Sequence, residues 1–456
     1  MRVAIVGSGI AGLAAAHRLQ PHASVTLFEA GAYFGGHTHT VDVALPVDGH
    51  TVRHGVDTGF LVYNERTYPQ LIALFAELKV HTSVSDMSFS VQTSDTALGR
   101  HLEWSGNSLS SVFSQRRNLI SPRFLGMLRD LARFNTLTQR LAREGDERQL
   151  QQPLGAFLRT HSFGAAFCDW YFMPMVACIW SCPKDQMLQF PVATMIRFCH
   201  NHGLNQVSNR PQWWTVTGGA RNYVDKILHR VLDKRLNTPV RAIRRHPSDA
   251  GVTLATDFGE EHFDKVVLAT HSDQSLALLS DADSQERATL GAIRYHPNHA
   301  VLHTDASVLP RHPRAWAAWN YESRGTVGAP SANANANDAV CLHYLLNKLQ
   351  PLPWTQPVLV SLNPIRNIAP ETILGSYDYA HPVFDRAAVA AQGQVSALQG
   401  VRNTYFCGAW MGYGFHEDGL KAGLEVARRV LGDAPVATAP AHPQAQSDRQ
   451  HEEAVV

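Results

Sequence analysis

The first 29 residues carry the pattern that most constrains what this chain can fold into. Arg2–Val6 is a short, nearly continuous apolar run, as expected of a parallel strand that is buried on both faces. A GxGxxG turn follows at residues 7–12, and Leu13–Leu19 predicts a helix. Ser24–Glu29 predicts a second strand that ends in a carboxylate. This order of elements predicts a Rossmann-type dinucleotide site.

Each part of this unit has a physical task. The first glycine permits a tight turn, the second lets the backbone approach a pyrophosphate, and the third lets the helix pack on the strands. The helix start offers unpaired N–H groups and its positive dipole end to the phosphates, and the terminal carboxylate can accept from ribose hydroxyls. The predicted cofactor contacts in this unit are Gly7, Gly9, Ile10, Ala11, Gly12 and Glu29.

Length and charge bound the remaining options. The chain has 456 residues, which exceeds the roughly 100–200 of one domain, so two domains are expected. Forty Lys and Arg residues balance 39 Asp and Glu residues, whereas a nucleic-acid-binding protein would carry a basic excess. Only 17% of the residues are charged, below the usual ~25%, which suits a large apolar cavity or an apolar docking face. These features favour a small-molecule or lipid substrate and leave the oligomeric state open.

The cysteines and the N-terminus indicate the compartment. The six cysteines contain no CxxC pair and are interpreted as small buried side chains in a reducing cytosol. Met1 leads directly into a strand without the segments of a secretory signal. The most apolar run, Met173–Trp180, is far shorter than the ~20 residues of a membrane span. We expect a cytoplasmic protein that is at most peripheral to the inner face of the membrane.

A second glycine pair follows the acid-ended strand. Phe34-Gly35-Gly36-His37 begins shortly after Glu29, and here the sequence resembles the superfamily of flavin-containing amine oxidases and phytoene desaturases. That superfamily places a glycine pair after the ribose-binding glutamate, where the backbone runs along FAD. Two arginines usually flank the pair, and this chain has Tyr33 and His37 instead. The resemblance implies FAD as the cofactor and leaves the phosphate contacts of those arginines unassigned.

The resemblance recurs along the chain. It covers a glycine-pair loop at residues 214–219, strands at 239–243 and 264–270, a strand broken by glycine at 404–410, and a helix start at 414–419. In the superfamily this helix start faces the N1–C2=O edge of the flavin, where the helix dipole stabilises the reduced anion. The cofactor contacts implied by these matches are Gly35, Gly36, His37, Thr38, Gly59, Phe60, Gly218, Gly219, Val240, Gly408, Asp418 and Gly419.

The implied fold is an α/β glutathione-reductase-like Rossmann FAD-binding domain with an inserted α+β substrate domain. Residues 1–70, 213–290 and 396–432 are expected to form the discontinuous FAD-binding domain, and residues 71–212 and 291–395 the substrate domain. Residues 433–456 are rich in Ala, Pro, Gln and His and predict a disordered tail.

A narrower match comes from strings that occur together at residues 35–40, 57–64, 198–204, 319–321 and 414–419. They resemble a group of bacterial predicted NAD/FAD-binding oxidoreductases, which are similar to enzymes that act on methyl-branched fatty acyl chains beside cyclopropane-fatty-acid synthases. This resemblance implies hydride removal from a C–H bond of a modified fatty acyl chain. Amine oxidation, a carotenoid- or porphyrin-type desaturation and a non-catalytic flavoprotein stay open as alternatives.

Two segments of the substrate half carry distinctive patterns. At ~100° per residue, the helix expected at 123–144 gathers its large apolar side chains on one arc. The opposite arc contains Arg129, Arg133, Arg140 and Arg143. This helix is either an ordinary helix with a solvated face or a basic amphipathic helix that lies on anionic lipid. Phe172–Met187 is rich in aromatic and sulfur side chains, which predicts either core or an adaptable acyl pocket.

Candidate acid–base groups lie in two motifs. His416 is the first choice because the ordinary pKa of histidine is about 6.5, and Glu417 and Asp57 are the other candidates. Glu417 can equally form a helix N-terminal charge pair with Asp418, and Asp57 can be a turn residue before Gly59. Amine oxidases of the resembled superfamily place an aromatic amine cage where this chain has His416, which disfavours an amine substrate.

The 24 histidines do not form a recognisable metal motif. The closest pairs are His37/His39 and His200/His202, each with one residue between them. Neither pair has the helical spacing of HExxH, and no quartet of Cys and His ligands is present. The sequence therefore predicts no catalytic metal.

Overall fold

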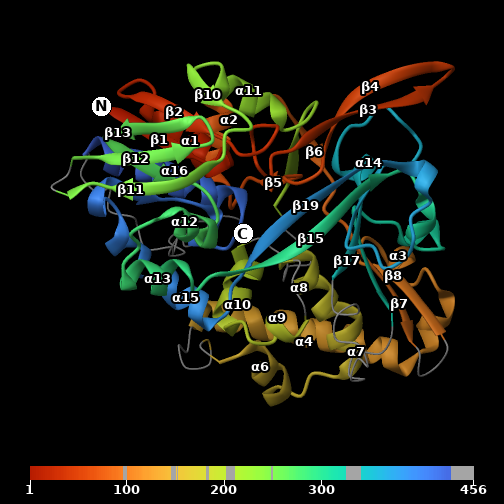
Figure 1. Cartoon of the computed structure of the whole chain (residues 1–456). Coiled ribbons are helices and arrows are strands. Elements are labelled where there is room, and N and C mark those ends of the chain that lie inside the picture. Colours follow the sequence, from red (N-terminus) through yellow and green to blue (C-terminus); the bar gives the residue numbers. More distant parts are fainter. Residues whose placement is uncertain are drawn as a thin grey trace, which may run out of the picture.

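The computed structural model describes residues 1–95, 100–144, 150, 152–180, 184–201, 211–247, 250–324 and 340–432. Five parallel strands form one sheet in the order β10-β2-β1-β14-β20 (Figure 1). Their bounds are β1 Arg2–Val6, β2 Ser24–Phe28, β10 Asp233–Arg235, β14 Lys265–Leu268 and β20 Thr404–Phe406. Three distant stretches of the chain therefore build one Rossmann-type sheet, which confirms the expected fold class.

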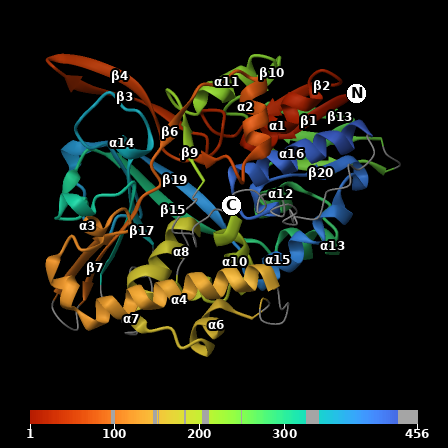
Figure 2. The ribbon, with the colours of Figure 1, turned by 180° about the vertical axis from the view of Figure 1, so that it is seen from behind.

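Both faces of this sheet are covered, as its continuous apolar strands predict. Val3 and Ile5 of β1 share a core cluster with helices α1 (Ile10–Leu19) and α16 (His416–Leu431), which lie side by side in Figure 2. Ala4 and Val6 point the other way and share a cluster with a small antiparallel sheet. That sheet contains β11 Val240–Arg245, β12 Val252–Thr256 and β13 Gly259–Phe263.

The substrate half is built on a second sheet of seven strands in the order β19-β15-β18-β17-β16-β7-β8. Neighbouring strands are antiparallel except for β16 and β7, which run parallel. The strands are β7 Phe89–Asp95, β8 Arg100–Ser105, β15 Arg294–His303, β16 Trp319–Arg324, β17 Cys341–Leu345, β18 Leu359–Leu362 and β19 Ile373–Val383. Helix α4 Pro122–Glu144 lies on the side of the molecule away from β1 and β2, and helices α8 Met173–Trp180 and α10 Val192–Asn201 lie between α4 and the centre (Figures 1 and 2).

The expected domain boundary after residue 70 can be compared with the elements that surround it. That position falls inside α2 (Pro69–Glu77), which packs on α16 of the FAD-binding half. The next strand, β6 (Thr82–Ser85), pairs with β9 (Trp213–Val216), which also pairs with β5 (Tyr63–Asn64). Residues 69–85 therefore contact elements of the expected FAD-binding half, and the boundary after residue 70 stays a prediction.

Helix α4 has the two faces that its sequence predicts. Phe124, Met127 and Phe134 are buried, whereas the side chain of Arg129 is 75% exposed. None of the helices in the described residues combines the length and apolar character that crossing a membrane requires. The predicted disordered tail and the side chain of Arg143 lie outside the described residues.

Candidate active site

A cavity of about 770 Å³ lies between the carboxyl ends of the parallel strands and the seven-stranded sheet. Its size is typical of a cofactor or ligand site, for which roughly 300–1,000 Å³ is usual. The sequence-predicted residues that line it are Gly7, Gly9, Ile10, Ala11, Glu29, Gly35, Gly36, His37, Gly59, Phe60, Val240, Gly408 and His416. Segments separated by up to about 400 residues of sequence thus meet around one space.

The glycine turn after β1 forms one end of the cavity. Gly7 adopts a left-handed φ of +98°, which the turn into α1 requires. Gly9 is the N-cap of α1, and no side chain accepts a hydrogen bond from the N–H groups at the start of the helix. The first turn of α1 also contains no acidic residue. A Cβ at Gly9 would meet no atom within 4 Å, so the backbone here is open to the cavity. Free N–H groups at an open helix start suit a pyrophosphate.

Glu29 lies at the carboxyl end of β2, beside this turn. One carboxylate oxygen accepts from Ser8 N at 3.0 Å, and the other accepts from Gly31 N at 2.8 Å. The Ser8 hydroxyl also donates to Glu29. These bonds fix the carboxylate while it still lines the cavity, so it is oriented to accept from ribose hydroxyls.

Two further loops close around the same point. A Cβ at Gly36 would lie 3.1 Å from Gly9 Cα, and one at Gly59 would lie 2.2 Å from the His37 carbonyl oxygen. The buried Nε2 atom of His37 has no hydrogen-bond partner among the described residues, and His37 lines the cavity. A buried polar atom without a partner is costly. The close backbone approach and this unsatisfied nitrogen fit a bound dinucleotide.

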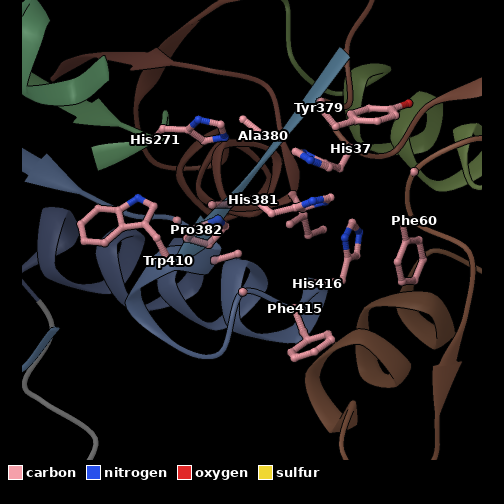
Figure 3. A pocket seen from close by; sticks show the side chains of 18 of the residues that line it. His37, Phe60, His271, Tyr379, Ala380, His381, Pro382, Trp410, Phe415 and His416 are labelled. Carbon is pink, nitrogen blue, oxygen red and sulfur yellow. The ribbon is translucent and has the colours of Figure 1, made fainter. Parts of the chain in front are cut away.

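His416, the first residue of α16, is held in a short polar chain. Its Nε2 atom lies 2.6 Å from the Tyr223 hydroxyl, which lies 2.6 Å from Thr38 Oγ1. The imidazole stacks on Phe60 with ring centroids 3.8 Å apart (Figure 3). Thr38 does not line the cavity in the described structure, so its contribution is to position His416 through Tyr223.

Burial changes the acid–base properties expected of His416. Burial lowers the pKa of His416 to about 3, far below the value of about 6.5 on which the sequence argument rested. The imidazole is therefore neutral around pH 7 and is a weak base. The same cause lowers the pKa of His37 to about 3, and His381, His271 and His416 nearby lower it further.

The other two acid–base candidates do not line the cavity. Asp57, at the end of β4 (His50–Asp57), accepts from the Thr40 hydroxyl, the Ala220 backbone N–H and the Gln350 amide. The Glu417 carboxylate accepts from the backbone N–H groups of Gln70 and Leu71, at the start of α2. Both carboxylates fasten distant segments together, and the catalytic role expected for them stays a prediction.

Several expected cofactor contacts have packing or capping roles in the structure, and their contact with the cofactor stays a prediction. A Cβ at Gly219 would lie 2.3 Å from Thr40 Cγ2, and one at Gly419 would lie 2.7 Å from Ile10 Cγ2. Asp418 accepts from the backbone N–H groups of Tyr413 and Phe415 and so caps α16. The predicted contacts that lie outside the cavity lining are Gly12, Thr38, Gly218, Gly219, Asp418 and Gly419.

A row of side chains on β19 was not predicted from the sequence as part of the site. His381 and Tyr379 line the cavity, with ring centroids 5.4 and 5.0 Å from the His37 ring (Figure 3). Tyr377, on the same strand, packs edge-on against His39. Aromatic rings at every second position from 377 to 381 share one face of a strand, and this alternation was the available signal.

One group of potential metal ligands occurs in the described residues: Glu322, Cys341 and His343, all buried in β16 and β17. None of them lines the cavity. The Glu322 carboxylate binds His343 Nε2 at 2.9 Å and Arg366 at 2.8 Å. The Arg366 guanidinium is already paired with the Glu322 carboxylate and would repel a metal cation at this position. We therefore interpret the group as a buried ion network.

Comparisons with known proteins agree with this geometry. No curated protein sequence matches the chain significantly. Similar solved structures include cyclohexylamine oxidase of Brevibacterium oxydans IH-35A, with 17% identity, a TM-score of 0.65, and coverage of 94% of this chain and 98% of that chain. The CLA-producing fatty acid isomerase of P. acnes has 15% identity and a TM-score of 0.61, with coverage of 94% and 98%. Putrescine oxidase bound to putrescine has 15% identity and a TM-score of 0.62, with coverage of 95% and 99%.

These identities are low, so the structures show a shared fold. The family model of flavin containing amine oxidoreductases matches residues 10–303, which is more than half of the chain. The match begins at the first residue of α1 and includes the Glu29 carboxylate and the loops that converge on His37. The chain therefore belongs to the flavin-containing amine oxidoreductase family and is an FAD-dependent oxidoreductase.

Proposed function

We propose that the substrate is a modified fatty acyl chain, methyl-branched or cyclopropane-related, from which the enzyme removes a hydride at a C–H bond. The lack of charge in the cavity carries this proposal. Among the described lining residues, Glu29 is the only Asp, Glu, Lys or Arg. Its carboxylate is already bound by Ser8 and Gly31 at the glycine-turn end. A cationic amine would find no free counter-ion among the described residues that line the substrate half of the cavity.

The cavity continues from the glycine turn into an apolar arm. This arm is formed by side chains of α8, α10, the seven-stranded sheet and the segment before β7: Met87, Phe89, Met175, Cys178, Ile179, Phe198, Trp319, Tyr344, Val360 and Leu362. Phe172 and Trp180, from the aromatic–sulfur stretch, belong to the core, whereas Met175 and Ile179 line the arm. Each buried CH₂ group of an acyl chain would contribute about 0.8 kcal/mol, which provides affinity without a charged anchor.

The chemistry follows from neutral side chains around a bound flavin. FAD, when bound, supplies a two-electron acceptor for a hydride. The described residues exclude water with apolar walls and hold His416 in place through Tyr223. If a C=C bond forms, the neighbouring carbon must also release a proton. His37, His381 and His416 are poor acceptors for it, since burial lowers their pKa values to about 3, 4 and 3.

This weak basicity favours a second candidate, a double-bond shift without net oxidation. If the hydride accepted by bound FAD were returned to another carbon of the same acyl chain, no proton would leave the substrate and no base would be required. The likeness to a protein described as a CLA-producing fatty acid isomerase supports keeping this candidate. The two reactions differ in their products: dehydrogenation lowers the mass of the acyl chain by two hydrogens, whereas isomerisation leaves the mass unchanged.

The substrate prediction can be tested by following flavin colour without oxygen. The holoenzyme is mixed with phospholipids that carry methyl-branched or cyclopropane acyl chains, and separately with mono- and polyamines. We expect bleaching by the lipids and none by the amines, with a product two hydrogens lighter by mass spectrometry. An isomerised product with the flavin still oxidised would select the second candidate. Bleaching by amines alone would overturn the lipid proposal.

Two variants test whether the apolar arm of the cavity binds the lipid substrate. Ile179→Trp places a larger side chain in the arm and should lower kcat/KM for the lipid at least about tenfold, because the acyl chain loses its space. Leu374→Trp, at a residue that is 38% exposed, is the matched control and should leave kcat/KM unchanged. Both variants should retain the flavin content of the wild type.

FAD is expected to be bound non-covalently. The glycine cradle and Glu29 supply hydrogen bonds and backbone contact, and no motif in the sequence indicates an attachment site. Acid precipitation should therefore release the yellow flavin into the supernatant, which absorbance measures directly. Flavin that stays in the pellet after denaturation would show a covalent link and contradict this prediction.

A further inference from the structure

Large apolar side chains are exposed in the stretch that leads into α4. Leu109 is 80% exposed and Ile120 is 84% exposed, and Leu119 and Leu125 are 50% and 43% exposed. Elsewhere in the described residues, exposed large apolar side chains are scattered singly or as one adjacent pair. Exposed apolar residues that gather in one place on a protein usually mark an interaction site.

This exposure is built into ordered structure. Ser108 and Ser111 form a capping box at α3 (Leu109–Val112), and the 3-10 turn Arg116–Ile120 that follows buries Asn118. Ser121 N donates to the Asn118 carbonyl, and the Phe113 ring lies 5.9 Å from the buried Phe124 ring of α4. The turn that presents Leu119 and Ile120 is therefore held against the start of α4.

The same stretch is basic and lacks exposed acids. No Asp or Glu occurs from Gly106 to Arg129. The flanking acids Glu103 and Asp130 are buried, with side chains 0% and 6% exposed. The exposed arginines of the stretch are Arg116, Arg117, Arg123 and Arg129. The fold adds exposed Arg311 and Arg314, because residues 313–315 pack against α3.

We propose that this α3–α4 surface docks on an anionic lipid membrane. It consists of Leu109, Leu119, Ile120 and Leu125 with the arginines at 116, 117, 123, 129, 311 and 314. The apolar side chains would enter the headgroup–acyl boundary, and the guanidinium groups would contact lipid phosphates. A membrane fits better than a protein partner because exposed apolar residues and exposed charge of a single sign stand together, and Asp130, which pairs with Arg129 at 3.6 Å, is buried.

The proposed α3–α4 surface differs from the arginine-rich arc of α4 that the sequence suggested as a lipid-binding face. Arg133, in the middle of that arc, is bound by Asp130 and the His161 carbonyl and lies over the Phe163 ring. Its guanidinium is therefore engaged within the protein. The exposed apolar side chains lie instead at the start of α4 and in the turn before it, where Arg117 also donates to the His101 carbonyl and Arg123 lies over the Trp170 ring. Docking there does not depend on which substrate the cavity accepts.

The proposal can be tested by co-sedimentation of the holoenzyme with lipid vesicles. Vesicles of phosphatidylcholine alone are compared with vesicles that also contain phosphatidylglycerol, at low and high salt. Binding is expected only with the anionic vesicles, and it should weaken as salt rises. Leu119→Ser/Ile120→Ser should weaken binding at least about tenfold, and Arg116→Gln/Arg117→Gln about 30-fold.

Two matched controls identify the surface. Leu232→Ser/Phe258→Ser removes apolar side chains that are 90% and 81% exposed elsewhere. Arg241→Gln/Arg244→Gln removes two exposed arginines of β11. Both controls should bind vesicles like the wild type, and all four variants should keep their flavin. Equal loss in a control, or no binding to anionic vesicles by the wild type, would overturn the proposal. Self-association that Leu119→Ser/Ile120→Ser abolishes, without vesicle binding, would assign the surface to a second copy of the chain.

Discussion

Replacing Gly9 by Val is expected to give a folded protein that has lost FAD affinity by at least about a hundredfold. The site accepts a Cβ without touching any protein atom, since none lies within 4 Å. The backbone of Gly9 is also extended rather than left-handed, with φ −63° and ψ 177°, so Val is not strained there. The added side chain would instead stand in the cavity, where the backbone must approach the pyrophosphate.

The measurement is fluorescence titration of the apoprotein with FAD, and far-ultraviolet circular dichroism monitors folding. Gly12→Val is the contrasting variant, because a Cβ there would lie 1.9 Å from the Gly7 carbonyl oxygen and would push α1 off the sheet. Gly12→Val should therefore lower the free energy of unfolding. Gly106→Val, where a Cβ also meets nothing within 4 Å, should change neither property. A Gly9→Val protein with full flavin occupancy would show that this turn does not hold the phosphates.

The contrast between these glycines shows which parts of the fold follow from local sequence. The unit from Arg2 to Glu29 is predictable because its parts are neighbours in the chain, and the spacing alone fixes the turn, the helix start and the carboxylate. The loop at Gly218 and Gly219 has a similar appearance in sequence, yet it packs against Thr40 and Gly55 of the β3–β4 hairpin (Thr40–Val47 and His50–Asp57). A glycine pair does not reveal whether a cofactor or the backbone of another segment approaches it.

The hydrogen-bond partners of Glu417 and Asp57 could not be predicted from the sequence for a related reason. The partners of Glu417 at the start of α2 are more than 340 residues away in the chain. The Gln350 amide that binds Asp57 is 293 residues away. A carboxylate placed next to a cofactor motif has the same sequence appearance whether it faces the cofactor or fastens two segments. Only the fold determines which groups are within hydrogen-bond distance.

The chemistry of the histidines depends on burial, which no local pattern encodes. His416 follows from the motif as a cavity residue, and the structure brings it there. Its neutrality comes from Phe60, Tyr223 and the helix around it, which are drawn from three separate parts of the chain. Burial lowers the pKa of His381 to about 4 in the same way, although it lies on a strand that the sequence assigned only to the substrate sheet.

Asp57 offers the sharpest test between a catalytic and a structural carboxylate. Asp57→Ala should lower the free energy of unfolding by roughly 3–5 kcal/mol, because it leaves the Ala220 N–H, the Thr40 hydroxyl and the Gln350 amide without their acceptor inside the protein. Asp57→Asn keeps one acceptor oxygen and should cost less. The flavin that remains bound in either variant should be reduced by substrate at the wild-type rate, since the carboxylate does not line the cavity.

The pH dependence distinguishes the roles further. Burial raises the pKa of Asp57 to about 7, although hydrogen bonds from Thr40, Ala220 and Gln350 act to lower it. Between the ordinary pKa of about 3.9 and this raised value, the folded protein holds a proton that the unfolded chain does not, so acidification stabilises the fold through this group and the gain is lost as pH rises through about 7. Compared with Asp57→Asn, the wild type should therefore gain roughly 2–3 kcal/mol between pH 8 and pH 5, measured as urea midpoints of the two apoproteins. Wild-type stability in Asp57→Ala combined with loss of flavin reduction would instead restore Asp57 as a catalytic group.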